Sequence, residues 1–107
     1  MLEVQVALPP PAKNLEVEML VETACAAEGL RQTLKGPLAK YPGSVHWHFK
    51  KGKQRGTLEI TLWKAQRRLW FKVQAGREGD WIETSLPRLQ RALDMAWSDT
   101  ISAMEGR

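Results

Sequence analysis

The chain has 107 residues, with 16 Lys and Arg against 12 Asp and Glu, and its net charge is +4. That length supports one hydrophobic core without disulfides, so we expect a single domain over residues 1–107. No stretch reaches the roughly 18 apolar residues of a membrane span, and residues 1–4 lack the basic start of a signal peptide. Since its one cysteine, Cys25, cannot form an internal disulfide, we expect a soluble, cytoplasmic protein.

The N-terminal segment predicts a short strand. Residues 2–8 alternate apolar and polar side chains, so they either add an edge to the main sheet or pair with another chain. Pro9–Pro11 ends this strand, because proline cannot donate to a β-ladder. A stiff connector is the expected role of the three prolines, ahead of a ligand for proline-binding modules.

A helix is predicted next, with Asn14 as its cap and its start near Leu15. Residues 15–21 also alternate, so a strand is an alternative for its first turns, but length and alanine content favour a helix. Gly36–Pro37 would end it, and residues 41–44 are expected to form a turn. Its apolar stripe would consist of Leu20, Ala24, Ala27, Leu30 and Leu34.

Residues 45–74 predict a three-stranded antiparallel meander, because apolar side chains occupy every second position of each strand. The first hairpin closes over a loop around Gly52 and Gly56, with Phe49 near Leu58. The second closes over residues 64–67. A slip of one residue would set apolar against polar side chains, so the register is fixed. It pairs Leu62 with Leu69, Ile60 with Phe71, Leu58 with Val73, Glu59 with Lys72 and Thr61 with Trp70.

The C-terminal segment predicts a helical turn over residues 81–85 joined to a helix over 86–104. Asp80 and Glu83 have the spacing of a capping box, while Pro87 suits the first turn of a later helix. The apolar series runs on through the proline without losing phase. The expected fold is therefore α+β, in the order (β)-α-β-β-β-α, with both helices on the apolar face of the sheet.

Positive charge is concentrated in the meander. Residues 50–77 hold nine basic residues and one acid, Glu59, whereas residues 1–34 and 78–107 are each net negative. This asymmetry indicates an anionic partner. Because phosphates attract cations and bases stack on exposed rings, we expect nucleic-acid binding by the second face of the sheet and its hairpin loops. The candidate residues are Lys50, Lys51, Lys53, Arg55, Trp63, Lys64, Arg67, Arg68, Trp70 and Lys72.

Other interpretations stay open. Cationic loops also keep a sheet soluble and stop its edges from pairing with neighbours. Trp63, Trp70, Trp81 and Trp97 could exceed what a small core buries, so a protein–protein interface or a homodimer is the alternative function. The sequence offers no glycine-rich phosphate loop and no nucleophile with supporting groups, so we expect neither catalysis nor a cofactor.

Two histidines share one strand face. His46 and His48 flank Trp47, and Glu59 is expected beside His48. Zinc could use such a pair, but it requires a third ligand and supporting outer groups. A histidine pair on a polar sheet face is the commoner case, so the sequence alone predicts no metal site.

The α-β-β-β-α order resembles the double-stranded RNA-binding domain over about residues 14–104, and residues 42–46 followed by Phe49 are similar to that family's entry into its first strand. The resemblance implies a sheet covered by two helices. In that family a lysine-rich segment at the start of the second helix grips phosphates across the RNA major groove. Here residues 80–85 are acidic and apolar, which argues against that mode of binding.

Overall fold

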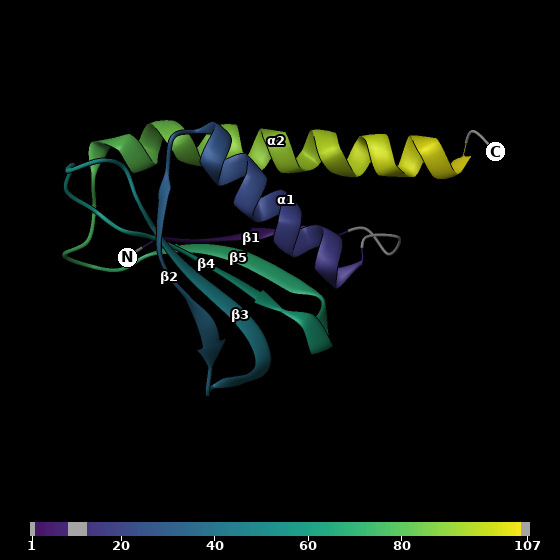
Figure 1. Ribbon diagram of the computed structural model, residues 1–107, viewed down its shortest axis with the longest axis horizontal. Coiled ribbons are helices and arrows are strands. Elements are labelled where there is room, and N and C mark those ends of the chain that lie inside the picture. Colours follow the sequence, from purple (N-terminus) through teal and green to yellow (C-terminus); the bar gives the residue numbers. More distant parts are fainter. Residues whose placement is uncertain (1, 9–12, 106–107) are drawn as a thin grey trace.

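Five antiparallel strands form one sheet in the order β1-β5-β4-β3-β2, and two helices lie against one of its faces (Figure 1). The computed structural model describes residues 2–8 and 13–105, and it describes the side chains of these residues except 14, 15 and 97–105. The elements are β1 (Leu2–Val6), α1 (Asn14–Ala27), β2 (Arg31–Leu38), β3 (Tyr41–Lys50), β4 (Leu58–Trp63), the short 3-10 helix η1 (Lys64–Gln66), β5 (Arg68–Val73) and α2 (Asp80–Glu105).

The predicted meander is confirmed as β3, β4 and β5. Phe49 pairs with Leu58 across the first hairpin, and all five predicted pairs between β4 and β5 are present. The second hairpin turns through η1 and Arg67, which has a left-handed backbone with φ of 50°. The strict alternation of apolar and polar side chains therefore fixed both hairpins in register.

Strand β1 joins this sheet as an edge strand. It pairs with β5 from Leu2 opposite Val73 to Val6 opposite Leu69. Its apolar residues thus extend the apolar face, which decides between the two alternatives left open for residues 2–8. The expected connector Pro9–Pro11 lies outside the described residues.

The prediction of a helix reaching Leu34 was wrong. Helix α1 ends at Ala27, Gly29 follows with φ of 75°, and the next residues form the fifth strand, β2. Glycine is the residue that most readily adopts this left-handed conformation after a helix. The buried stripe of α1 is Val17, Val21 and Cys25, with Leu20 and Ala24 only partly buried beside it.

Three smaller predictions also need correction. Lys13, not Asn14, is the N-cap of α1, and its backbone N–H donates to Glu16 Oε2. Residues 41–44 begin β3 instead of forming a turn, because the chain reverses at residues 39–40. Helix α2 is continuous from Asp80, with the exposed Pro87 inside it. Solvent can hydrate the carbonyl that this proline leaves without a donor.

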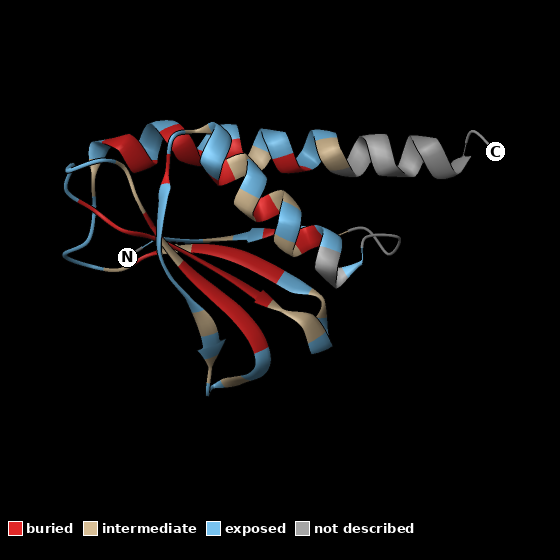
Figure 2. Ribbon diagram, viewed as in Figure 1, coloured by how far each residue is buried: buried red, intermediate tan, exposed pale blue. Residues whose placement is uncertain are grey.

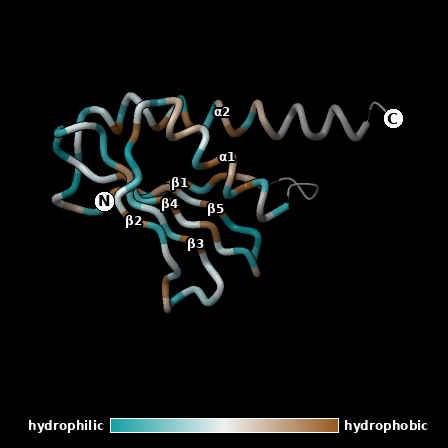
Figure 3. The backbone as a smooth tube through the Cα atoms, in the orientation of Figure 1, coloured by the Kyte–Doolittle hydropathy of each residue, from teal (hydrophilic) through white to brown (hydrophobic). Residues whose placement is uncertain are grey.

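The core lies between the sheet and the two helices (Figure 2). Trp47, Ile60 and Phe71 occupy three neighbouring strands and are at most 2% exposed, and Leu89 of α2 and Val17 of α1 belong to the same buried cluster. Figure 3 shows hydrophilic residues along the loop between β3 and β4. No helix within the described residues is long and apolar enough to cross a membrane.

We expect the thiol of Cys25 to be unreactive in the native protein. Burial, with Glu22 and Glu28 acting in the same direction, raises its pKa to about 12, so almost no thiolate exists at neutral pH. A thiol-specific chromogenic reagent should label the native chain slowly and label one thiol per chain at once in denaturant. Rapid labelling of the native chain would contradict this burial.

Candidate functional site on the second face of the sheet

The sheet face turned away from the helices, here called the second face, is more enclosed than the sequence indicated. Glu59 and Thr61 of β4 are 3% and 2% exposed, and His46 and Trp70 on the strands beside it are 6% and 5% exposed. A polar sheet face open to water would leave such side chains largely accessible. The second face carries His46, His48, Lys50, Glu59, Thr61, Trp63, Arg68, Trp70 and Lys72.

Tyr41 at the start of β3 covers part of this face. Pairing between β3 and β4 begins only at Val45, which leaves Tyr41 to contact the two tryptophans. The Tyr41 ring centroid is 4.9 Å from that of Trp63 and 5.1 Å from that of Trp70. The guanidinium of Arg68 lies 5.0 Å from the Trp70 ring. Trp70 is therefore not free to stack on a base, contrary to the sequence prediction, while Trp63 is half-buried.

The cations of the first hairpin loop lie at the surface. Lys53 and Arg55 are exposed, and Lys51 is half-exposed. None of these three side chains has an ion pair with another described residue. Lys50 is held within the hairpin, where its Nζ donates to the carbonyl of Gly56 and to Thr57 Oγ1 at 3.2 and 3.3 Å.

The second hairpin contributes less positive charge than predicted. Lys64 turns toward α1, where its Nζ lies 3.1 Å from Glu18 Oε2. Arg68 donates to Gln5 Oε1 on β1 at 3.4 Å, and Lys72 is half-buried opposite Glu3. The ten predicted residues therefore do not form one surface. The unpaired positive charge lies mainly at the first hairpin.

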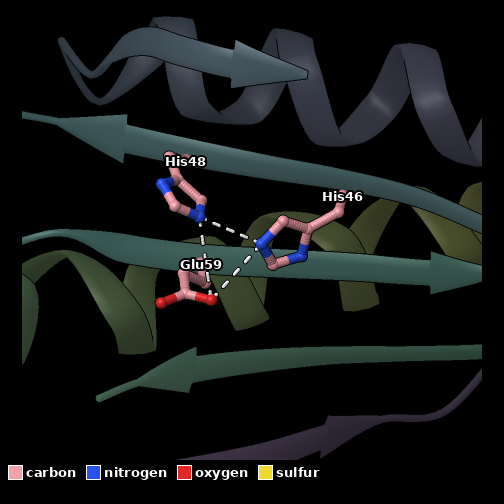
Figure 4. A group of neighbouring side chains, drawn as sticks. All are labelled: His46, His48 and Glu59. Carbon is pink, nitrogen blue, oxygen red and sulfur yellow. Dashed lines mark hydrogen bonds and ion pairs between the residues drawn. The ribbon is translucent and has the colours of Figure 1, made fainter. Parts of the chain in front are cut away.

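The two histidines converge with Glu59 at the middle of the second face (Figure 4). His48 stands opposite Glu59 in the β3–β4 register, as the sequence predicts. The two Nε2 atoms are 3.0 Å apart, and Glu59 Oε1 lies 3.3 Å from His46 Nε2 and 3.7 Å from His48 Nε2. Three atoms able to bind a cation thus face one point between two strands.

Outer groups hold this cluster in place. Thr61 Oγ1 lies 2.8 Å from His46 Nδ1, so the other ring nitrogen faces the cluster. Gln74 Nε2 donates to Glu59 Oε2 at 2.6 Å, and an Arg77 nitrogen lies 3.7 Å from the same oxygen. Burial, assisted by the charge of His48, lowers the pKa of His46 below its ordinary value, so this imidazole is neutral at pH 7.

The outer groups were not predicted as part of a site, although the strand register indicated where they would lie. Once Phe49 is placed opposite Leu58, the alternation sets Thr61 opposite His46, as observed. Gln74 follows the last residue of β5 and is the diagonal neighbour of Glu59, because Glu59 pairs with Lys72, so the predicted register also placed it within reach.

No protein-family model, curated protein or solved structure matches this chain. The order of elements also departs from the double-stranded RNA-binding domain, since four strands separate the two helices where that resemblance required three.

A separate hollow of about 810 Å³ lies beside the start of α2. Its lining includes Arg55, Asp80, Trp81 and Glu83, so charges of both signs face it. Trp81, a candidate interface residue, is buried there, and its Nε1 donates to the carbonyl of Arg55 at 2.9 Å. The side chain of Trp97 lies outside the described residues.

Proposed function

We propose that the chain is a small non-catalytic binding domain that binds nucleic acid through phosphate contacts from its first hairpin loop. One observation carries the proposal. The only acid between residues 50 and 77 is Glu59, and that carboxylate is buried and bonded to Gln74. The charge that the meander presents to solvent is therefore entirely positive. An anionic polymer is the partner that such a surface attracts most strongly.

The enclosed tryptophans change the expected mode of binding. Because Trp70 is covered by Tyr41 and Arg68, base stacking contributes little, and affinity comes from Lys51, Lys53 and Arg55. Contacts to phosphate carry no base information, so binding is independent of sequence. The two hairpin loops lie about 20 Å apart, since β4 has six residues at roughly 3.3 Å each. Arg68 could extend the contact with nucleic acid toward the second hairpin loop.

The proposal predicts a steep salt dependence. With three phosphate contacts on a single strand, raising the salt from about 50 to about 200 mM should weaken binding about 20-fold. Fluorescence anisotropy with labelled single-stranded and duplex RNA and DNA would measure this. Replacing Lys51 and Lys53 together by Gln should reduce affinity at least about tenfold and lower the salt slope by about 1.4.

A matched control removes the same charge elsewhere. Arg88 and Arg91 are exposed on α2, and Arg88 forms only a surface ion pair with Glu28. Their joint replacement by Gln should change nucleic-acid affinity less than about twofold, because both residues lie on α2 outside the first hairpin loop, and loss of the surface pair should cost little stability. Equal losses in the two double variants would indicate unspecific attraction to net charge. No binding to any of the four nucleic acids at low salt would contradict the proposal and favour the alternative, a protein partner or a homodimer.

A further inference from the structure

Hydrogen bonds cannot bridge all three atom pairs in the cluster of His46, His48 and Glu59 at the same time. Three pairs of atoms face one another at its centre, and each pair needs a proton of its own to form a hydrogen bond. If one Nε2 carries a proton, the lone pair of the other Nε2 faces a lone pair of the Glu59 carboxylate. If both carry protons, the two N–H groups oppose each other. One cation at the centre would be bound by all three atoms at once.

The spacing of the three atoms suits a first-row metal ion. Zinc binds imidazole nitrogen and carboxylate oxygen at about 2.0–2.2 Å, so two ligands of a tetrahedral ion are separated by about 3.3–3.5 Å. The observed separations of 3.0, 3.3 and 3.7 Å bracket this value. The atoms come from two paired strands, β3 and β4, and each of these strands also pairs with a neighbour on its other side, which holds the three atoms in place.

The surroundings also resemble those of a metal centre. Metal-binding histidines usually form a hydrogen bond through their second ring nitrogen, as His46 does with Thr61. Glu59 Oε2 accepts a hydrogen bond from Gln74 and forms an ion pair with Arg77, so Oε1 is left to face the histidines. The side chain of His48 is 22% exposed, against 8% for His46 and 4% for Glu59, so solvent reaches the centre from the His48 side.

We propose that His46 Nε2, His48 Nε2 and Glu59 Oε1 bind one divalent first-row transition metal ion, with Zn²⁺ the best match. Two imidazoles and one carboxylate are a ligand set that such ions accept, and three protein ligands leave a fourth position for water or a partner's donor. From the sequence, His46 and His48 were expected on one face with Glu59 beside His48, and no metal site was predicted. The structure adds the short distances between the three atoms and the outer groups around them, and the site is independent of nucleic-acid binding.

Titration of the tag-free, chelator-treated 107-residue chain with Zn²⁺ tests this site. These are the chain's only two histidines, so histidine-dependent binding reports on this cluster alone. Calorimetry should give one ion per chain, and Co²⁺ should develop the intense visible bands of a four-coordinate ion. His48→Gln, at the accessible side of the cluster, should weaken Zn²⁺ binding at least about 100-fold. Gln74→Leu should weaken it about tenfold, as expected for loss of an outer partner.

Glu83→Gln is the matched carboxylate control, because Glu83 is exposed on α2 away from the cluster. It should bind Zn²⁺ as the parent chain does. Circular dichroism of each metal-free variant would establish that it is folded. Absence of 1:1 binding in the parent chain would overturn the proposal and identify the cluster as a hydrogen-bonded network. Binding that His48→Gln leaves unchanged in a folded chain would overturn it equally.

Discussion

Replacing Trp47 by Ala should lower the free energy of unfolding by about 3–5 kcal/mol, the range for removing a large aromatic side chain from a core. Trp47 is fully buried on β3, with Ile60 of β4 opposite it. Lys35 of the edge strand β2 pairs with Trp47 on its other side, so the cavity would open beneath α1 between two strands. With a urea slope near 2 kcal/mol/M, the midpoint should fall by about 2 M.

Trp47 also links α1 to the sheet through a polar contact. Its Nε1 donates to Glu22 Oε2 at 2.9 Å, and Lys35 Nζ lies 2.8 Å from the same oxygen. Trp47→Phe should keep most of the burial and lose this bond, at a cost of about 0.5–1.5 kcal/mol. Met19→Ala is the control, because Met19 is 60% exposed on α1 and should change stability by less than about 0.5 kcal/mol. Equal losses for Trp47→Ala and Met19→Ala would contradict this account of the core.

The meander was predictable because its strands have a period of exactly two over three consecutive segments. One register alone places Ile60 beside Phe71 and Trp47 on the same face, and the structure has that register. The same alternation predicted a strand over residues 2–8, while its place at the edge of this sheet is known only from its pairing with β5. Local patterning is most informative where one face of a strand is wholly apolar.

Strand β2 was not predictable in this way. Leu30 and Leu34 continue the phase of the helix, yet Gly29 ends it and Leu34 is 45% exposed on the edge strand. Residues 31–35 contain little that favours a strand by itself. Their conformation comes from pairing with β3, which is a tertiary effect that outweighs local propensity.

The candidate sites also have features that the sequence predicts and features that depend on the folded structure. The positive charge of the first hairpin is a property of composition and was visible in the sequence. The enclosure of Trp70 was not, because it depends on Tyr41 reaching across from a strand end. Likewise, the pairing of His48 with Glu59 follows from register, whereas the approach of their side chains to His46 Nε2, at 3.0 and 3.3 Å, depends on side-chain geometry.

Gly79→Ala should destabilise the chain by about 2–6 kcal/mol. A Cβ at Gly79 would overlap the backbone carbonyl oxygen of Arg55, so the hairpin loop and the start of α2 would have to separate. That movement would weaken the bond from Trp81 Nε1 to the same carbonyl and the bond from the Thr57 N–H to the carbonyl of Arg77. Overpacking costs about 1–3 kcal/mol and each weakened hydrogen bond about 0.5–1.5 kcal/mol.

Gly36→Ala supplies the matched control for this prediction. Gly36 lies on the edge strand β2, a Cβ there would meet no atom within 4 Å, and its φ is not positive. The substitution should change stability by less than about 0.5 kcal/mol, or raise it slightly by restricting the unfolded chain. Urea unfolding of both variants gives the comparison. Similar midpoints for the two would mean that the first hairpin and α2 are not in tight contact, and that Trp81 owes its burial to the core alone.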